Sequence, residues 1–340
     1  MSLRAAKPGE LSLLCKIRGR AARSSSGDLS LGIGDDCALL RLSPGEELAV
    51  TTDLSIAGRH FQLDWHPPES VGHRALARGL SDLAAMGARP VAAFLSLGLP
   101  GELTRSSSRK PSWISRFYDG LLALAETHAT PLAGGDLAQS PVPVADIVLV
   151  GAVPRGKALL RSGARPGHLL YVTGNLGGSA AGLAQLADLD AESKQPGRRP
   201  LNISANLATQ LKSHLYPQPR IPQGLWLRQY GRATAAIDLS DGLSTDLAHL
   251  CTESSVTAEV DSTRLPIHPG ASLEQALHGG EDYELLFTAR SSVRIPQSIA
   301  GIPITRIGRI LGPRKGRPLV AIGTAQNKHP LEPHGWEHFS

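Results

Sequence analysis

The chain contains 340 residues, of which 41% are hydrophobic and 19% are charged, and these ordinary proportions exclude a protein that is disordered throughout. Aromatic residues make up only 4% of the sequence, which leaves few side chains for a surface that stacks on nucleic-acid bases. The 35 Lys and Arg residues outnumber the 30 Asp and Glu residues, and the net charge of +5 favours anionic ligands without identifying one.

Strands and helices are predicted to alternate along the chain. Short aliphatic and β-branched runs predict strands at residues 47–52, 90–97, 130–133, 147–153, 169–173, 234–237 and 283–288. Apolar side chains at helical spacing predict helices at residues 69–86, 112–128 and 243–251. Since both halves contain both kinds of element, we predict an α/β (α+β) fold with two domains, residues 1–153 and residues 154–340.

The cysteines and the hydropathy pattern indicate where the protein acts. Cys15, Cys37 and Cys251 lie far apart without a C-x-x-C pair, so the sequence suggests neither a disulfide framework nor a thiolate zinc site. No apolar stretch reaches the ~18 residues of a membrane span, and the basic residues are dispersed rather than gathered into a nucleic-acid patch. We therefore expect a cytoplasmic protein with neither a membrane nor a nucleic acid as its partner.

Acidic residues recur beside glycine or at the ends of apolar runs. They stand in Gly34-Asp35-Asp36, Thr51-Thr52-Asp53, Ser81-Asp82, Gly134-Gly135-Asp136, Asp238-Leu239-Ser240-Asp241 and Gly279-Gly280-Glu281-Asp282. Mg²⁺ prefers oxygen ligands and is usually bound by carboxylates together with substrate phosphates. The pattern therefore predicts phosphoryl transfer. The alternative for single motifs is turn chemistry, or a helix cap at Ser240 or Asp241.

Two glycine-rich segments imitate nucleotide-binding motifs. The segment Gly151 to Ala158 nearly spells a phosphate-binding P-loop, but Ala158 occupies the place of the hydroxyl residue that binds Mg²⁺. The turn at residues 174–182 is not followed, about 20 residues further on, by a second strand that ends in an acidic residue, which a dinucleotide-binding turn requires. We expect neither to bind a nucleotide in that way.

Taken in order, the acidic segments and their neighbours resemble the thiamine-monophosphate kinase family, which shares a superfamily with aminoimidazole-ribonucleotide synthetase. The resemblance spans nearly the whole chain and is carried by the strings G-I-G-D-D-C-A-L-L, T-T-D, H-F, L-S-D-L-A-A-M-G-A, G-G-D, L-R-S-G-A-R-P-G, D-L-S-D-G-L and G-G-E-D-Y-E-L. It implies direct, in-line transfer of the γ-phosphoryl group of ATP to thiamine monophosphate with several Mg²⁺ ions, the final step of thiamine diphosphate biosynthesis. It also implies a homodimer formed by the N-terminal domain, and a C-terminal domain that closes over nucleotide and substrate.

The resemblance also implies roles for individual residues. The implied Mg²⁺ ligands are Asp36, Thr51, Thr52, Asp53, Asp82, Asp136, Asp238 and Asp241. The implied ATP contacts are Gly135, Asp136, Arg161 and Ser240, and those of thiamine monophosphate are His60, Glu281 and Trp336. Asp53, Asp136, Arg161 and Asp241 are the residues that we expect to carry catalysis. For His60 the alternative is a solvent-facing loop position, and for Trp336 it is packing of the C-terminal segment.

Two other functions fit parts of the pattern. One is a different ATP-using member of the superfamily, such as a synthetase that phosphorylates an amide or formyl oxygen. The other is a non-catalytic module that binds a nucleotide with Mg²⁺. His168, the basic segment at residues 18–30 and the polar segment at residues 191–199 depart from the family's pattern, but none of them removes a matched ligand.

Overall fold

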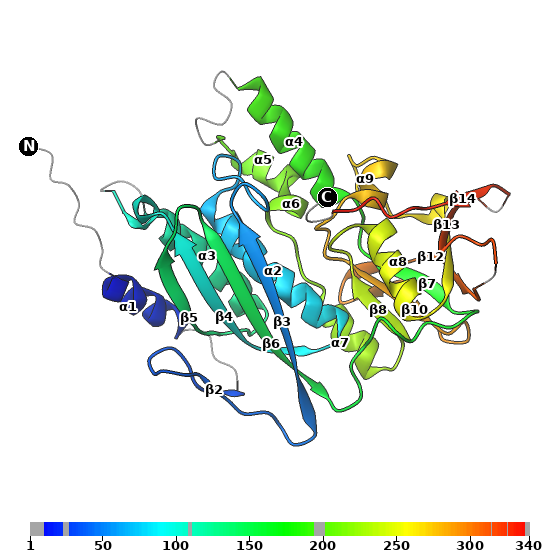
Figure 1. The fold of residues 1–340 in the computed structure, drawn as a ribbon, viewed down its shortest axis with the longest axis horizontal. Coiled ribbons are helices and arrows are strands. Elements are labelled where there is room, and N and C mark those ends of the chain that lie inside the picture. The colour runs from blue at the N-terminus through cyan, green and yellow to red at the C-terminus, as the bar shows by residue number, and fades with distance from the viewer. Residues whose placement is uncertain are drawn as a thin grey trace, which may run out of the picture. The chain divides into compact units, whose positions relative to one another are not determined.

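The computed structural model describes residues 10–22, 27–107, 111–193, 201–313, 315–324 and 326–336. The chain divides into two compact units, each assembled from separate stretches of sequence. The N-terminal unit comprises Met1–Leu80, Pro90–Ala152 and Leu186–Ala208, and the C-terminal unit comprises Ser81–Arg89, Val153–Gln185 and Thr209–Ser340. Both contain helices and strands, so the predicted mixed fold class is confirmed (Figure 1).

A four-stranded sheet forms the body of the N-terminal unit. Its strands lie in the order β3 (Glu46–Ile56), β6 (Val144–Pro154), β4 (Arg89–Leu99) and β5 (Leu132–Gln139). A small two-stranded sheet of β1 (Leu29–Leu31) and β2 (Leu39–Leu40) belongs to the same unit, as do α1 (Glu10–Ala21) and the short η1 (Gly101–Thr104). Strand β3 is therefore one edge of the large sheet and β5 is the other.

Helices α2 (Pro68–Ala85) and α3 (Trp113–Thr127) pack closely against each other. A Cβ atom added to Gly72 would lie 1.9 Å from the carbonyl oxygen of Phe117, and one added to Gly120 would lie 1.8 Å from that of Glu69. Only glycine permits this approach at either position. The predicted apolar stripe of α2 is confirmed, since Leu76, Leu80 and Leu83 are buried.

The C-terminal unit is built around a larger, mostly antiparallel sheet. Its strand order is β14 (Lys328–Pro330), β13 (Val320–Gly323), β9 (Thr257–Asp261), β12 (Ile302–Leu311), β7 (Leu169–Thr173), β10 (Leu285–Ala289) and β8 (Ala235–Asp238), with β11 (Ser298–Ile299) paired to β12. The helices of this half of the chain are α4 (Gly178–Glu192), α5 (Ala205–Gln210), α6 (Lys212–Leu215), α7 (Ile221–Gln229), α8 (Leu243–Glu253), η2 (Ser262–Arg264) and α9 (Leu273–His278). Leu247 and Leu250 of α8 share one apolar core with Leu170 and Ile237 of the sheet.

The structure differs from the predicted elements at several boundaries. The strand predicted from residue 283 begins at Leu285, because Glu281 and Tyr283 have φ angles of 64° and 51° that turn the backbone before it becomes extended. The strand predicted at residues 130–133 runs instead from Leu132 to Gln139. The polar composition of residues 191–199 predicts an exposed loop, but the first two of these residues end α4, and residues 194–199 lie outside the described part of the chain.

Candidate functional site

Asp53, in the N-terminal unit, is held by an arginine that the sequence analysis did not single out. Arg78 of α2 donates from Nε and from a terminal guanidinium nitrogen to Oδ1 of Asp53, both at 3.3 Å. Side chains alternate between the faces of a strand, so Thr51 and Asp53 share a face of β3, whereas Thr52 lies on the other. The three adjacent predicted Mg²⁺ ligands therefore do not all present their side chains to one side.

Asp136 lies on β5, at the opposite edge of the sheet from Asp53. Three strand spacings separate these edges, which corresponds to about 14 Å. Gly135 has a φ angle of 145°, and a Cβ atom there would lie 1.9 Å from the carbonyl oxygen of Leu95. The backbone conformation and the close packing therefore require glycine at this position whether or not a ligand binds. Asp53 and Asp136, two predicted Mg²⁺ ligands of this unit, therefore lie at opposite edges of the sheet and do not form one cluster of carboxylates.

Asp36 lies in an exposed turn, where its backbone N–H donates to Oδ1 of Asp35 at 2.9 Å. The flanking residues Ala38 and Leu40 pack against the small apolar cluster that contains Ala133 of β5. The segment that carries Asp36 thus belongs to the same side of the unit as the strand that carries Asp136.

His60 occupies the turn that follows β3. Its Nδ1 accepts the backbone N–H of Ile56 at 3.1 Å, and its carbonyl oxygen accepts a hydrogen bond from Arg74 at 3.2 Å. Because Nδ1 is the acceptor, the neutral ring carries its proton on Nε2. His60 is therefore a fixed, half-buried side chain rather than the solvent-facing loop residue of the alternative interpretation.

In the C-terminal unit, Asp238 ends β8 as a buried carboxylate. It is 3% exposed, and its Oδ2 accepts a hydrogen bond of 2.6 Å from the hydroxyl of Ser81, which is fully buried. Ser81 immediately precedes Asp82 near the end of α2. Asp82 and Asp238 are both predicted Mg²⁺ ligands, and the structure places the segment that carries Asp82 next to Asp238.

The loop after β8 gathers further predicted site residues of the same unit. The N–H of Glu281 donates to the carbonyl oxygen of Ser240 at 2.8 Å, and the N–H of Trp336 donates to that of Asp241 at 3.3 Å. Close packing supports both contacts, since a Cβ atom on Gly280 would lie 2.5 Å from the carbonyl oxygen of Ser240. Ser240, Asp241, Glu281 and Trp336 are therefore neighbours, and half of the Trp336 surface remains exposed.

A further carboxylate, Asp246, underlies this loop and was missed by the sequence analysis. It is 3% exposed and accepts three backbone N–H groups from residues 240–242. Burial raises its pKa to about 8, assisted by the negative charges of Asp238 and Asp241, while the hydrogen bonds from the loop oppose the shift. The available sequence signal was an acidic residue in the first turn of a helix, where carboxylates are stabilising.

Arg161 is anchored away from this loop. Its carbonyl oxygen accepts the hydroxyl of Ser254 at 2.6 Å, and Ser254 is the C-terminal cap of α8. Asp241 precedes the N-terminal end of the same helix, and 11 residues of helix span about 16 Å. The backbone of Arg161 thus lies by the C-terminal end of α8, and its side chain is exposed.

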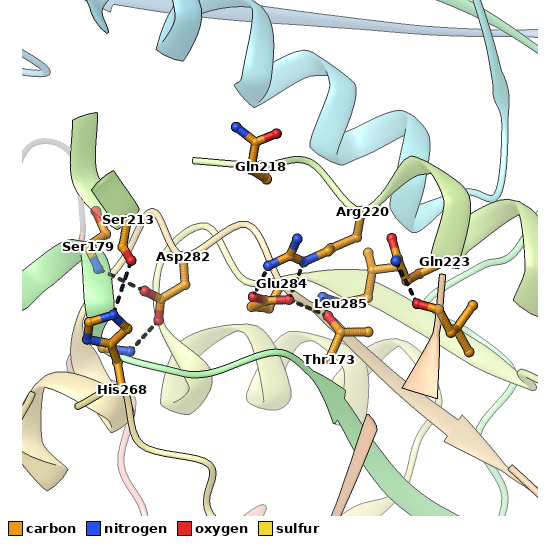
Figure 2. Close-up of polar contacts among 12 residues, drawn as sticks. Thr173, Ser179, Ser213, Gln218, Arg220, Gln223, His268, Asp282, Glu284 and Leu285 are labelled. Atoms are coloured by element: carbon orange, nitrogen blue, oxygen red, sulfur yellow. Dashed lines mark hydrogen bonds and ion pairs between the residues drawn. The ribbon is translucent and has the colours of Figure 1, made fainter. Parts of the chain in front are cut away.

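A pocket of about 290 Å³ adjoins the segment that follows Glu281. Asp282 and Glu284 both line it, and Figure 2 shows their contacts. Asp282 accepts the N–H groups of Gly177 at 2.6 Å and Ser179 at 3.1 Å, and so caps α4. Burial raises the pKa of Asp282 to about 7. Asp282 belongs to one of the acidic segments found in the sequence, but neither it nor Glu284 was expected to have an individual role.

Glu284 belongs to a buried polar network. Arg220 donates to it through Nε at 2.6 Å and through a terminal nitrogen, and the hydroxyl of Thr173 also donates to it (Figure 2). That hydroxyl in turn accepts the N–H of Leu285 at 2.8 Å. The network joins β7, β10 and the segment before α7, and it fixes the backbone just beyond the Glu281 turn.

The predicted ligands around the loop after β8 have the type of donor atom that a hard cation prefers. Asp82, Ser240, Asp241 and Asp238 offer only oxygen atoms, which Mg²⁺ prefers. Within the part of the chain that the structure describes, no group of three His, Cys, Asp or Glu side chains lies close enough to hold a metal ion.

The same described residues contain no helix with the length and apolar character that crossing a membrane requires.

The comparisons with known proteins cover almost the whole chain. Residues 34–153 match the family described as AIR synthase related protein, N-terminal domain, and residues 165–313 match its C-terminal domain. Thiamine-monophosphate kinase of Escherichia coli (strain K12) is 39% identical over 98% of both chains, and that of Bacillus subtilis (strain 168) is 34% identical over 97% of this chain and 99% of the relative.

Solved structures agree with the sequence relatives. Thiamine-monophosphate kinase from Stenotrophomonas maltophilia K279a superposes with a TM-score of 0.76 at 37% identity, over 92% of this chain and 96% of the other. A structure described as AaThiL complexed with AMPPCP and TMP gives a TM-score of 0.72 at 31% identity over all of both chains. The chain therefore belongs to the thiamine-monophosphate kinase family.

Proposed function

We propose that this protein transfers the γ-phosphoryl group of ATP to thiamine monophosphate and so forms thiamine diphosphate, the final step of that biosynthesis. The full-length likeness to thiamine-monophosphate kinases supports the activity, as does the likeness to a structure bound to AMPPCP and TMP. The observation that carries the proposal within this chain is the loop after β8. There Ser240 and Asp241, the expected nucleotide and metal contacts, lie against Glu281 and Trp336, the expected substrate contacts.

The chain's own residues would bind the nucleotide, the substrate and the metal ions in this reaction. Ser240 would contact the nucleotide, Trp336 would cover the thiamine rings, and Glu281 and His60 would orient the substrate. We propose that each unit holds Mg²⁺ through oxygen ligands, which are Asp36, Thr51, Thr52, Asp53 and Asp136 in the N-terminal unit and Asp82, Asp238 and Asp241 in the C-terminal unit. Mg²⁺ bound there would supply positive charge against the phosphates. Arg161 would steady the nucleotide phosphates through its exposed side chain.

The chemistry requires positioning more than acid–base catalysis. The attacking atom is a phosphate oxygen that is already ionised near neutral pH, so no strong general base is needed. Two unit charges held ~4 Å apart repel by roughly 4 kcal/mol at an effective dielectric constant of ~20. Direct transfer predicts inversion of configuration at a chiral γ-phosphorus, and retention would contradict it.

We also propose a homodimer that forms through the edge strand β3. Leu48, Val50 and Leu54 alternate on one face of that strand and are 55%, 60% and 46% exposed. A long, apolar edge strand invites pairing with another strand. We expect analytical ultracentrifugation at micromolar concentration to give a dimer and Val50→Lys to give a monomer. A monomeric wild-type protein would contradict this proposal.

We also propose that the enzyme acts in the cytoplasm. Cys15 and Cys37 are exposed free thiols and Cys251 is a buried one, and the reducing cytoplasm keeps thiols in this state.

An acceptor panel tests the activity against the two rival functions. ADP release should depend on thiamine monophosphate and stay at background with amide- or formyl-bearing acceptors. A synthetase of the same superfamily predicts the reverse preference, and a non-catalytic module predicts ATP binding with no ADP release at all. Either of those outcomes would replace the proposed function.

A further inference from the structure

The loop between β8 and α8 carries Ser240 and Asp241, yet its helix begins without a capping side chain. The N-cap residue is Gly242, with a φ angle of 108°. A Cβ atom there would lie 2.9 Å from the backbone of His278, so glycine is required at this position.

Asp246, in the first turn of the helix, binds the backbone of the loop that leads into it. Its Oδ2 atom accepts the N–H groups of Ser240, Asp241 and Gly242, each at 3.1 Å, and the side chain is buried. Three consecutive N–H groups that converge on one oxygen form a concave anion site. Here a carboxyl group of the same chain occupies that site.

The loop is also held through its carbonyl groups. The N–H groups of Glu281 and Trp336 donate to the carbonyl oxygens of Ser240 and Asp241, respectively. Asp246 therefore fixes one edge of this backbone segment, while the two expected substrate contacts attach to the other edge. If the Asp246 carboxylate were lost, both the loop and its attachments would gain freedom.

We propose that Asp246 is a positioning residue that holds the loop backbone so that Ser240 and Asp241 meet Mg²⁺ and nucleotide through their side chains. The proposal rests on the proposed function for its kinetic consequences, but not for the loop geometry. Groups behind a metal ligand typically change metal affinity or activity by about 10–100-fold when they are removed. Asp246 should act in that range without touching the nucleotide.

Three variants separate this role from general stability. Asp246→Ala removes the acceptor, Asp246→Asn retains one acceptor oxygen and the side-chain size, and Glu253→Ala removes an exposed carboxylate from the last turn of the same helix. Folding is checked by circular dichroism, and the Mg²⁺ dependence of turnover is then measured at saturating ATP. We expect the Mg²⁺ concentration for half-maximal rate to rise about 10–100-fold in Asp246→Ala, less in Asp246→Asn, and not in Glu253→Ala.

Amide hydrogen exchange of the wild-type protein provides a readout that needs no activity. Ser240, Asp241 and Gly242 should exchange slowly although they lie in a loop, and Asp246→Asn should accelerate them while leaving the centre of α8 protected. Rapid exchange of these amides in the wild type would overturn the proposal. So would a folded Asp246→Ala variant whose Mg²⁺ dependence matches that of Glu253→Ala. If the wild type forms no thiamine diphosphate, the proposed function fails, and the exchange data alone decide the role of Asp246.

Discussion

Replacing Glu284 with glutamine tests the buried network behind the Glu281 turn. The residue is 3% exposed, and its carboxyl group receives two hydrogen bonds from Arg220 and one from Thr173. Glutamine has nearly the same shape but no charge, so the guanidinium of Arg220, whose side chain is 15% exposed, would stay buried without its counter-ion. Breaking a buried pair in this way costs about 3–5 kcal/mol.

A surface pair in the same unit supplies the control. Asp261 and Arg264 form an ion pair whose side chains are 38% and 57% exposed, and solvent screens such surface pairs so that they contribute little to stability. Equilibrium urea unfolding should therefore show a much larger loss for Glu284→Gln than for Asp261→Asn. Adding Arg220→Met to Glu284→Gln should recover part of the loss, because neither charge then remains buried. Equal losses in the two single variants would refute the reasoning.

Three further changes probe the candidate site and its surroundings. Asp53→Asn should lower kcat by about 100-fold or more while circular dichroism stays unchanged, since it removes a negative charge that is expected to bind Mg²⁺; near-normal kinetics would remove Asp53 from the site. Ser81→Ala should cost about 1.5–3 kcal/mol of unfolding free energy, because the buried Asp238 carboxylate loses a donor, and an unchanged unfolding curve would show that the hydroxyl does not support it. Burial raises the pKa of Asp282 from 3.8 to about 7, so between these values the folded protein keeps a proton that the unfolded chain has lost, and stability falls as the pH rises. Relative to Asp282→Asn, the wild type should lose about 2 kcal/mol of unfolding free energy between pH 5.5 and pH 8; a constant difference between the two proteins would contradict the raised pKa.

Local patterns in the sequence were sufficient for much of the fold. The β-branched runs correctly predicted β3, β4, β6 and β7, and helical spacing predicted α2, α3 and α8. These elements are long or strongly apolar, so their periodicity outweighs weaker local preferences. Strand order is a different matter, because no local pattern specifies which strands pair. The separation of Asp53 and Asp136 onto opposite edges of one sheet became visible only in the structure.

Two of the residues that sequence reasoning missed have partners that lie far away in the chain. Arg78 is 25 residues from Asp53, and Arg220 is 64 residues from Glu284. Asp246 lies close to its partners, but an acidic residue in the first turn of a helix is common enough to suggest only a cap. The positive φ angle of Glu281 could not be predicted from the sequence either, since residues other than glycine seldom adopt that conformation.

Mass spectrometry of a single incubation tests the central claim most directly. The purified protein is mixed with ATP, Mg²⁺ and thiamine monophosphate, and a parallel sample contains chelator in place of Mg²⁺. We predict a species heavier than thiamine monophosphate by one phosphoryl group, formed together with an equal amount of ADP only when Mg²⁺ is present. ATP consumption without thiamine diphosphate, or no reaction by a protein that binds ATP, would contradict the account.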